Sequence, residues 1–167
     1  MREIYKNTML ISEAYFKENS PIPDNYNWKE ITPFVTLAQR IWLRPVIGDK
    51  LYEELLKEVK NNNVTAENST LLLKTYPFLS MCIVYESMTF LAYNFNEKGI
   101  TQNKSETSEP IGTQEFTQIK NDVRAKIEIL KDELVQFINE HKECYPLYVG
   151  KSESNSDLRI FNSNGIY

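Results

Sequence analysis

The sequence predicts a mainly α-helical bundle with a long amphipathic C-terminal helix, a mobile loop and extended terminal arms. Apolar residues recur at helical spacing in several segments, and glycine is scarce, with 5 copies in 167 residues, which disfavours a turn-rich β fold. The length suits one domain with its own hydrophobic core. We therefore expect one helical body over residues 1–150, including a mobile polar loop at 96–110, and an extended arm over residues 151–167.

The first strong helical pattern begins near Thr32. Thr32 followed by Pro33 is typical of an N-cap and a first helical residue, because the N–H that proline lacks is not needed there. The apolar face of this helix, which is expected to be either core or interface, consists of Phe34, Leu37, Ala38, Ile41 and Trp42. Residues 44–48 contain a proline and a glycine and predict a tight corner. Asp49 is then expected to cap a second helix that ends at residues 61–63.

Residues 65–95 form the most apolar part of the chain. A short helix over 65–74 is expected, with Thr65 as a possible cap, and Pro77 is expected to open a new helix. The segment 78–95 is apolar on nearly every side and is the best candidate for a central buried helix. The residues that interrupt it are Ser80, Glu86, Ser87 and Asn94. A membrane span needs about 20 largely uncharged residues, so none is expected here.

The strongest periodic signal lies in the C-terminal third. Steps of three and four residues separate Phe116, Ile119, Val123, Ile127, Leu130, Leu134, Phe137 and His141. This spacing predicts a helix over 113–141 that would be about 40 Å long at 1.5 Å per residue.

The two chain ends carry different patterns. Residues 4–11 fit either an extended strand or the lead into a short helix capped by Ser12, and the sequence does not decide between them. After Gly150, a polar stretch is followed by apolar residues, which gain more by binding a neighbouring protein than by facing water. The candidate interface residues of this arm are Leu158, Ile160, Phe161, Ile166 and Tyr167.

Residue types with catalytic or metal-binding chemistry are sparse. The only histidine, His141, lies three residues before Cys144, but a structural zinc site needs four ligands and no second cluster follows. No Gly-x-Ser-x-Gly turn and no glycine-rich phosphate loop occur. Cys82 lies in the apolar segment and is expected to be a buried hydrophobic residue. We expect no enzymatic activity, no cofactor and no metal.

A small basic and aromatic cluster is formed by Arg40, Trp42 and Arg44. These residues are compatible with a phosphate backbone or a stacked base, and equally with a protein partner. The net charge of -4 repels phosphate, and Trp and Arg are enriched at protein interfaces. A protein interface is therefore favoured, and a small helical nucleic-acid-binding or regulatory module is the alternative.

One stretch resembles a known family. Ala38-Gln39, followed after five residues by Pro45-Val46-Ile47-Gly48-Asp49-Lys50-Leu51-Tyr52-Glu53-Glu54-Leu55, resembles a pattern of phage head-to-tail connector proteins and is similar to those of the crAss-like phages of gut bacteria. Further residues similar to that family are Asn19-Ser20-Pro21-Ile22, Asn25, Ile31, Pro33 and Asn164-Gly165-Ile166-Tyr167. Together they cover about a third of the chain, and no role is carried over for loop 96–110 or the tail after Gly150.

The resemblance implies a structural virion protein, assembled in the host cytoplasm, that forms a ring at the interface between head and tail. Twelve copies are the expected number. Its implied partners are copies of itself, the portal protein and other connector or tail proteins, with DNA only as passing cargo and no membrane. The acidic total charge fits an inner surface along which DNA slides, and the arm over 161–167 is expected to dock on an adjacent subunit or on the portal.

Overall fold

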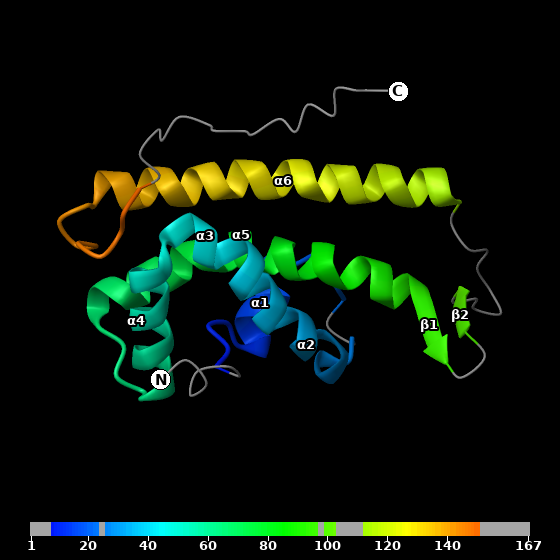
Figure 1. Cartoon of the computed structure of the whole chain (residues 1–167), viewed down its shortest axis with the longest axis horizontal. Coiled ribbons are helices and arrows are strands. Elements are labelled where there is room, and N and C mark those ends of the chain that lie inside the picture. Colours follow the sequence, from blue (N-terminus) through cyan, green and yellow to red (C-terminus); the bar gives the residue numbers. More distant parts are fainter. Residues whose placement is uncertain (1–7, 24–25, 97–98, 103–111, 151–167) are drawn as a thin grey trace, which may run out of the picture.

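Two long antiparallel helices organise the molecule (Figure 1). The computed structural model describes residues 8–23, 26–96, 99–102 and 112–150. Its elements in chain order are α1 (Glu13–Asn19), α2 (Trp28–Ala38), the π-helical turn η1 (Gln39–Leu43), α3 (Arg44–Ile47), α4 (Asp49–Lys60), α5 (Ala66–Ala92), β1 (Tyr93–Asn96), β2 (Gly99–Gln102) and α6 (Thr113–Glu140). The predicted mainly α-helical bundle is confirmed.

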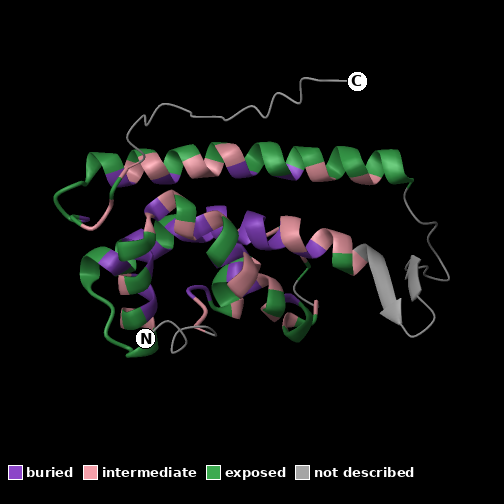
Figure 2. Ribbon diagram, in the orientation of Figure 1, coloured by how far each residue is buried: buried purple, intermediate pink, exposed green. Residues whose placement is uncertain are grey.

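Helix α5 lies in the middle of the bundle. Helix α6 runs along one side of α5, and α1, α2 and η1 contact α5 away from α6 (Figure 1). Fully buried side chains along α5 include Leu71, Phe78, Leu79 and Ile83. Figure 2 shows buried residues along α5, whereas the outer side of α6 is exposed. The predicted central buried helix is therefore present, but its last described turns are more open, with Phe90 49% exposed.

The predicted long C-terminal helix is confirmed as α6, and its apolar seam is confirmed in part. Val123, Ile127 and Leu134 are buried against the rest of the bundle, but Ile119 is 44% exposed. The first turns of α6 lie beyond the well-covered part of α5, so fewer side chains surround them. His141, the last residue of the predicted seam, is exposed and lies at the C-cap.

Helix α2 begins before the predicted start at Thr32. Asn27 is the N-cap, and its side-chain oxygen accepts a hydrogen bond from the Lys29 N–H at 3.1 Å. Thr32 is inside the helix, where its hydroxyl donates to the Trp28 carbonyl at 3.0 Å. Pro33 has no N–H to donate to the Lys29 carbonyl. This is tolerated because Lys29 lies in the exposed first turn of the helix.

The π-helical turn changes which face of this helical path is buried. A π turn contains an extra residue, so the apolar pattern downstream shifts in phase. The buried apolar residues of the path are Ile31, Val35, Ala38, Leu43 and Ile47. Of the five residues predicted to share one core or interface face, only Ala38 is buried, whereas Ile41 is 48% exposed and Trp42 is half-buried.

The predicted corner at 44–48 is confined to one residue. Residues 44–47 are helical as α3, and Gly48 makes the turn with a φ of 83°, a conformation that favours glycine. Asp49 was predicted to cap α4, but Gly48 occupies the N-cap position. The Asp49 carboxylate instead binds Arg44.

Residues 66–92 form one helix rather than the two that were predicted. Thr65 acts as the cap, since its hydroxyl accepts the Asn68 N–H at 3.3 Å. Pro77 lies within α5 instead of opening a new helix. The buried residues on both sides of it, Tyr76 and Phe78, pack into the core, and this burial outweighs the hydrogen bond that proline removes.

Part of the predicted polar loop has regular structure. Strands β1 and β2 pair antiparallel, with Phe95 opposite Ile100 and Asn96 opposite Gly99. Helix α5 therefore ends at Ala92, three residues before the predicted end at Phe95. Residues 97–98 and 103–110 of the predicted loop, and the predicted arm over 151–167, lie outside the described residues.

The N-terminal segment is fastened by a buried side chain. Ser12 caps α1, which selects the helical lead-in from the two alternatives for residues 8–11, whereas residues 4–7 lie outside the described residues. Gln39, 1% exposed, accepts a hydrogen bond from the Leu10 N–H at 2.6 Å and donates one to the Thr8 carbonyl at 3.0 Å. The segment before α1 is thus held against η1, with Leu10 and Ile11 in the core.

Candidate interaction surface

The three residues of the predicted basic and aromatic cluster lie on two different faces. Residues 40 and 44 are about one π turn apart, whereas residue 42 is about half a turn from both. Trp42 accordingly contacts α5, while Arg44 contacts α4. Arg40 is exposed. The structure therefore does not bring them together as one binding patch.

Trp42 joins η1 to the last turns of α5. Its indole N–H donates to the Glu86 carboxylate at 2.8 Å, and its ring meets Tyr85 edge-on with centroids 5.6 Å apart. Lys120 of α6 lies 4.8 Å from the centroid of the same Tyr85 ring and donates to the Thr89 hydroxyl at 2.9 Å. Trp42 thus has a structural role in holding η1 against α5.

Arg44 is neutralised within the fold. Its guanidinium donates to the Asp49 carboxylate at 2.7 Å and lies 5.9 Å from the centre of the Tyr52 ring. The hydrogen bond to Asp49 is the main reason that the pKa of Arg44 is raised. Burial raises the pKa of the Tyr52 hydroxyl, and this effect exceeds the opposing influence of a Gln39 hydrogen bond and of Arg44 and Arg40. The charge of Arg44 is therefore largely committed to the α3–α4 corner.

Exposed and half-buried apolar side chains occur where α2 and η1 meet the end of α5, and we call this set of residues the ridge. We define the ridge by Phe34, Ile41, Trp42, Tyr85 and Phe90. The Phe34 and Phe90 rings touch with centroids 5.3 Å apart. Phe90 and Ile41 are each about half exposed, at 49% and 48%. Exposed apolar side chains next to aromatic residues are typical of a site that binds another protein.

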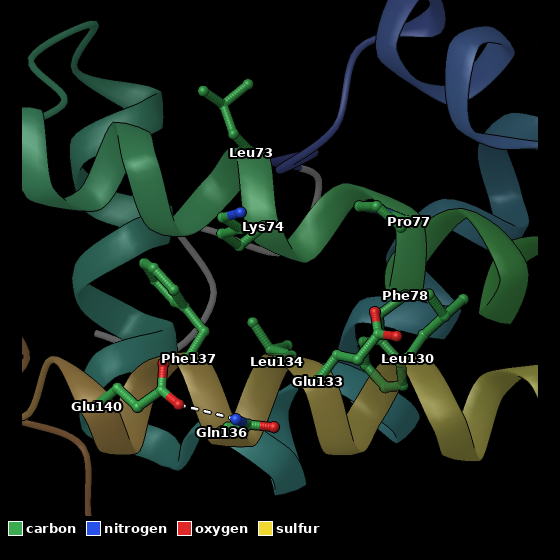
Figure 3. A pocket seen from close by; sticks show the side chains of 10 residues that line it. All are labelled: Leu73, Lys74, Pro77, Phe78, Leu130, Glu133, Leu134, Gln136, Phe137 and Glu140. Carbon is green, nitrogen blue, oxygen red and sulfur yellow. Dashed lines mark hydrogen bonds between the residues drawn. The ribbon is translucent and has the colours of Figure 1, made fainter.

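A groove separates α5 from the last third of α6 (Figure 3). Its volume is about 420 Å³, and its walls consist of Leu73, Lys74, Pro77, Phe78, Leu130, Glu133, Leu134, Gln136, Phe137 and Glu140. The apolar floor of the groove is formed by the half-buried Pro77, Leu130 and Phe137, with the buried Phe78 and Leu134 beneath them. Glu133 and Glu140 are exposed, as is Lys74, whose ammonium lies 5.7 Å from the Phe137 ring centre. The groove thus combines an apolar interior with a charged rim.

Among the described residues, titratable groups do not converge in a metal-binding arrangement, in this groove or elsewhere. Within residues 8–23, 26–96, 99–102 and 112–150, no three His, Cys, Asp or Glu side chains are placed to hold a metal ion. His141 contacts the Phe137 ring and has its Nδ1 2.9 Å from the Phe137 carbonyl oxygen. Burial raises the pKa of the Cys82 thiol, whereas Cys144 is exposed.

None of the described helices has both the length and the apolarity that a membrane span requires.

The candidate interface residues of the predicted C-terminal arm lie outside the described residues. They are Leu158, Ile160, Phe161, Ile166 and Tyr167. Their role therefore stays a prediction.

A protein-family model matches residues 43–157, which is more than half of the chain. The chain belongs to DUF6712, a family of unknown function. The DUF6712 match includes α3 to α6, and it therefore contains Arg44 and both walls of the groove. Helix α2, Arg40 and Trp42 precede the matched residues. No curated protein and no solved structure matches the chain.

The groove of this DUF6712 chain was not predicted, although the sequence carries a signal for it. Glu133, Gln136 and Glu140 follow helical spacing along one edge of the predicted apolar seam, and Pro77 marks the facing helix. The contact between Phe34 and Phe90 joins residues 56 positions apart, and no local pattern indicates it.

Proposed function

We propose that this protein is a structural virion subunit that binds copies of itself in a ring at the head-to-tail junction of a tailed bacteriophage. It acts by binding, without catalysis, between the portal and the tail, and DNA passes through the ring. The proposal rests on the resemblance of residues 45–55 to phage connector proteins and on one structural observation, the exposed apolar ridge.

The ridge supports assembly because Ile41 and Phe90, two large apolar side chains, are each about half exposed to solvent. Covering such surface with a partner is favourable by about 25 cal/mol for each Å² removed from water. Aromatic residues at the centre of a patch are also the commonest energetic centres of protein interfaces.

A ring requires contact between two different surfaces of each subunit, because a head-to-tail contact closes by rotation. The ridge is formed where α2 and η1 meet α5, and the outer face of α6 lies across α5 from α2 (Figure 1). Ile129, on that outer face, is 60% exposed. We propose that the ridge of one copy contacts the outer face of α6 in the next.

The first test is the mass of the purified protein over a range of concentrations, followed by electron microscopy with a portal protein. Ile41→Asp should weaken self-association at least tenfold, since a central interface residue contributes more than about 1.4 kcal/mol. Val64→Asp is the matched control, because Val64 is exposed in the connection between α4 and α5, away from the ridge. A monomer at every concentration, with no affinity for a portal, would refute the proposal.

The arm provides a second test. Deleting residues 158–167 should abolish ring assembly and leave the helical content of the monomer unchanged, as measured by circular dichroism. Unchanged assembly would exclude the arm from the subunit contact.

A nucleic-acid-binding module is the competing function. Its support was the cluster of Arg40, Trp42 and Arg44, and two of these side chains are engaged within the fold by Glu86 and Asp49. The connector proposal predicts no tight DNA binding. A gel-shift titration across salt concentrations that shows tight, salt-sensitive binding would favour the competing function.

A further inference from the structure

The groove between α5 and α6 has the chemistry of a peptide-binding site. Its floor is apolar and its rim is charged, as described above (Figure 3). Pro77 has no N–H, so the Leu73 carbonyl lacks the donor that a regular helix would supply. Residues four apart share a helix face, and both Leu73 and Pro77 line the groove. An extended peptide supplies what this site lacks, namely apolar side chains and a backbone N–H.

The dimensions of the groove fit a short extended segment. The groove has a volume of about 420 Å³. An apolar cavity of about 150 Å³ holds one benzene ring. The groove therefore has room for two or three apolar side chains. Along α6 it extends from Leu130 to Glu140, about 15 Å at 1.5 Å per residue. Four extended residues span about 13 Å.

The described chain ends next to this groove. The Tyr145 hydroxyl donates to the Glu67 carbonyl at 2.9 Å, and the Tyr145 ring is 6.1 Å from that of Phe137, which lines the near end of the groove. The chain then reaches Gly150 after five more residues. Residues 151–157, if extended, cover about 23 Å, which exceeds the length of the groove, about 15 Å.

We propose that the groove binds the chain's own segment Leu158–Phe161, with Leu158 and Ile160 on its apolar floor. These two residues share one side of an extended segment, and Asp157 and Arg159 share the other. A segment that enters at Phe137 and runs toward Leu130 places Asp157 beside Lys74 and Arg159 beside Glu133.

Charge spacing supports this register. Lys74 lies over Phe137, and Glu133 is one helical turn before Phe137, about 6 Å along α6. Asp157 and Arg159 are two extended residues apart, about 6.6 Å, and carry the opposite charges in the matching order. Glu133 has no hydrogen bond or ion pair within the part of the chain that the structure describes. It is therefore available to Arg159.

The segment is assigned to the same chain because a short linker keeps it close to the groove. A short flexible linker gives an effective concentration in the millimolar range, which a second copy matches only at high protein concentration. The assignment goes beyond the proposed ring. It anchors the start of the arm and leaves residues 162–167 to reach a neighbour.

Disulfide trapping in the full chain tests the assignment. In a Cys144→Ser background, Glu133→Cys is combined with Arg159→Cys, which the proposal places side by side. The control combines Asp132→Cys with Arg159→Cys, because Asp132 is an exposed neighbour of Glu133 that does not line the groove. Under mild oxidation of dilute protein, the Glu133 pair should form an intramolecular disulfide at least tenfold faster than the control. The proposal would be overturned if the two cysteine pairs formed disulfides at equal rates. It would also be overturned if disulfides formed only between different copies of the protein.

Hydrogen exchange provides a measurement that needs no cysteine. Amides of residues 158–161 should be protected in the unmodified chain and in Asp132→Lys, and should lose at least tenfold of that protection in Glu133→Lys. Exchange of these amides at the rate of an unfolded peptide in the unmodified chain would also overturn the assignment. Both measurements succeed or fail in a monomer, so their outcome is separate from that of ring assembly.

Discussion

Replacing Gln39 by Met should weaken the attachment of the N-terminal segment to the bundle. Met has a similar length and shape but cannot form the two hydrogen bonds by which Gln39 holds the Leu10 N–H and the Thr8 carbonyl. Each bond contributes about 1 kcal/mol, and the Leu10 N–H, in a residue 3% exposed, adds about 1 kcal/mol when it is left unpaired. We expect a loss of about 2–3 kcal/mol from the free energy of unfolding, which is a large share of the 5–15 kcal/mol typical of a domain.

Urea denaturation measures this change as a lower midpoint with an unchanged slope. Gln118→Met is the matched control, because Gln118 is exposed and bonds only to Asp122 of its own helix in the described structure, so its change should stay within about 0.5 kcal/mol. Hydrogen exchange should also show faster exchange at the Leu10 amide. If Gln39→Met matched the control in both measurements, the fastening by Gln39 would be refuted.

Three further predictions follow from single residues. Gly48→Ala should lower the free energy of unfolding by about 1–2 kcal/mol because φ is 83°, whereas Gly112, also an N-cap, has a φ of -64° that alanine adopts, so Gly112→Ala should cost less; equal midpoints in urea would contradict this reasoning. The pKa of Tyr26 is raised from 10.0 to about 12, first by burial and then by Glu30, so the folded state holds this proton more tightly. Stability should therefore fall as pH rises from 10 to 12, and Tyr26→Phe should reduce that fall; identical pH profiles would exclude the effect. A thiol reagent should react rapidly with one cysteine in the native protein, and Cys144→Ser should remove that reaction, because Cys82 is buried and its pKa is raised; a remaining fast thiol would disprove it.

The candidate sites differ in how much the sequence reveals of them. Arg40, Trp42 and Arg44 are close in the sequence and were grouped for that reason, but the π turn sends Trp42 toward Glu86 and Arg44 toward Asp49. The groove has a readable wall in α6, because helical spacing places Glu133 and Glu140 along one edge. Its other wall depends on Pro77 remaining inside a helix, which local rules disfavour.

The sequence alone determined the features that depend on local spacing and local hydrogen bonds. Scarce glycine and apolar residues at helical spacing predicted the helical class, steps of three and four predicted α6, and Ser12 was recognised as a possible cap for α1.

The tertiary structure alone decided the features that require distant residues to meet. It kept Pro77 within α5, since burial of the residues around it outweighs one lost hydrogen bond. It placed the π turn where the Gln39 side chain meets the N-terminal segment, and so chose which apolar residues of that path face solvent. Helical spacing in the sequence indicates which residues of one helix face a partner. The ridge and the groove, however, each form between two helices, and the relative placement of those helices depends on packing across the whole core.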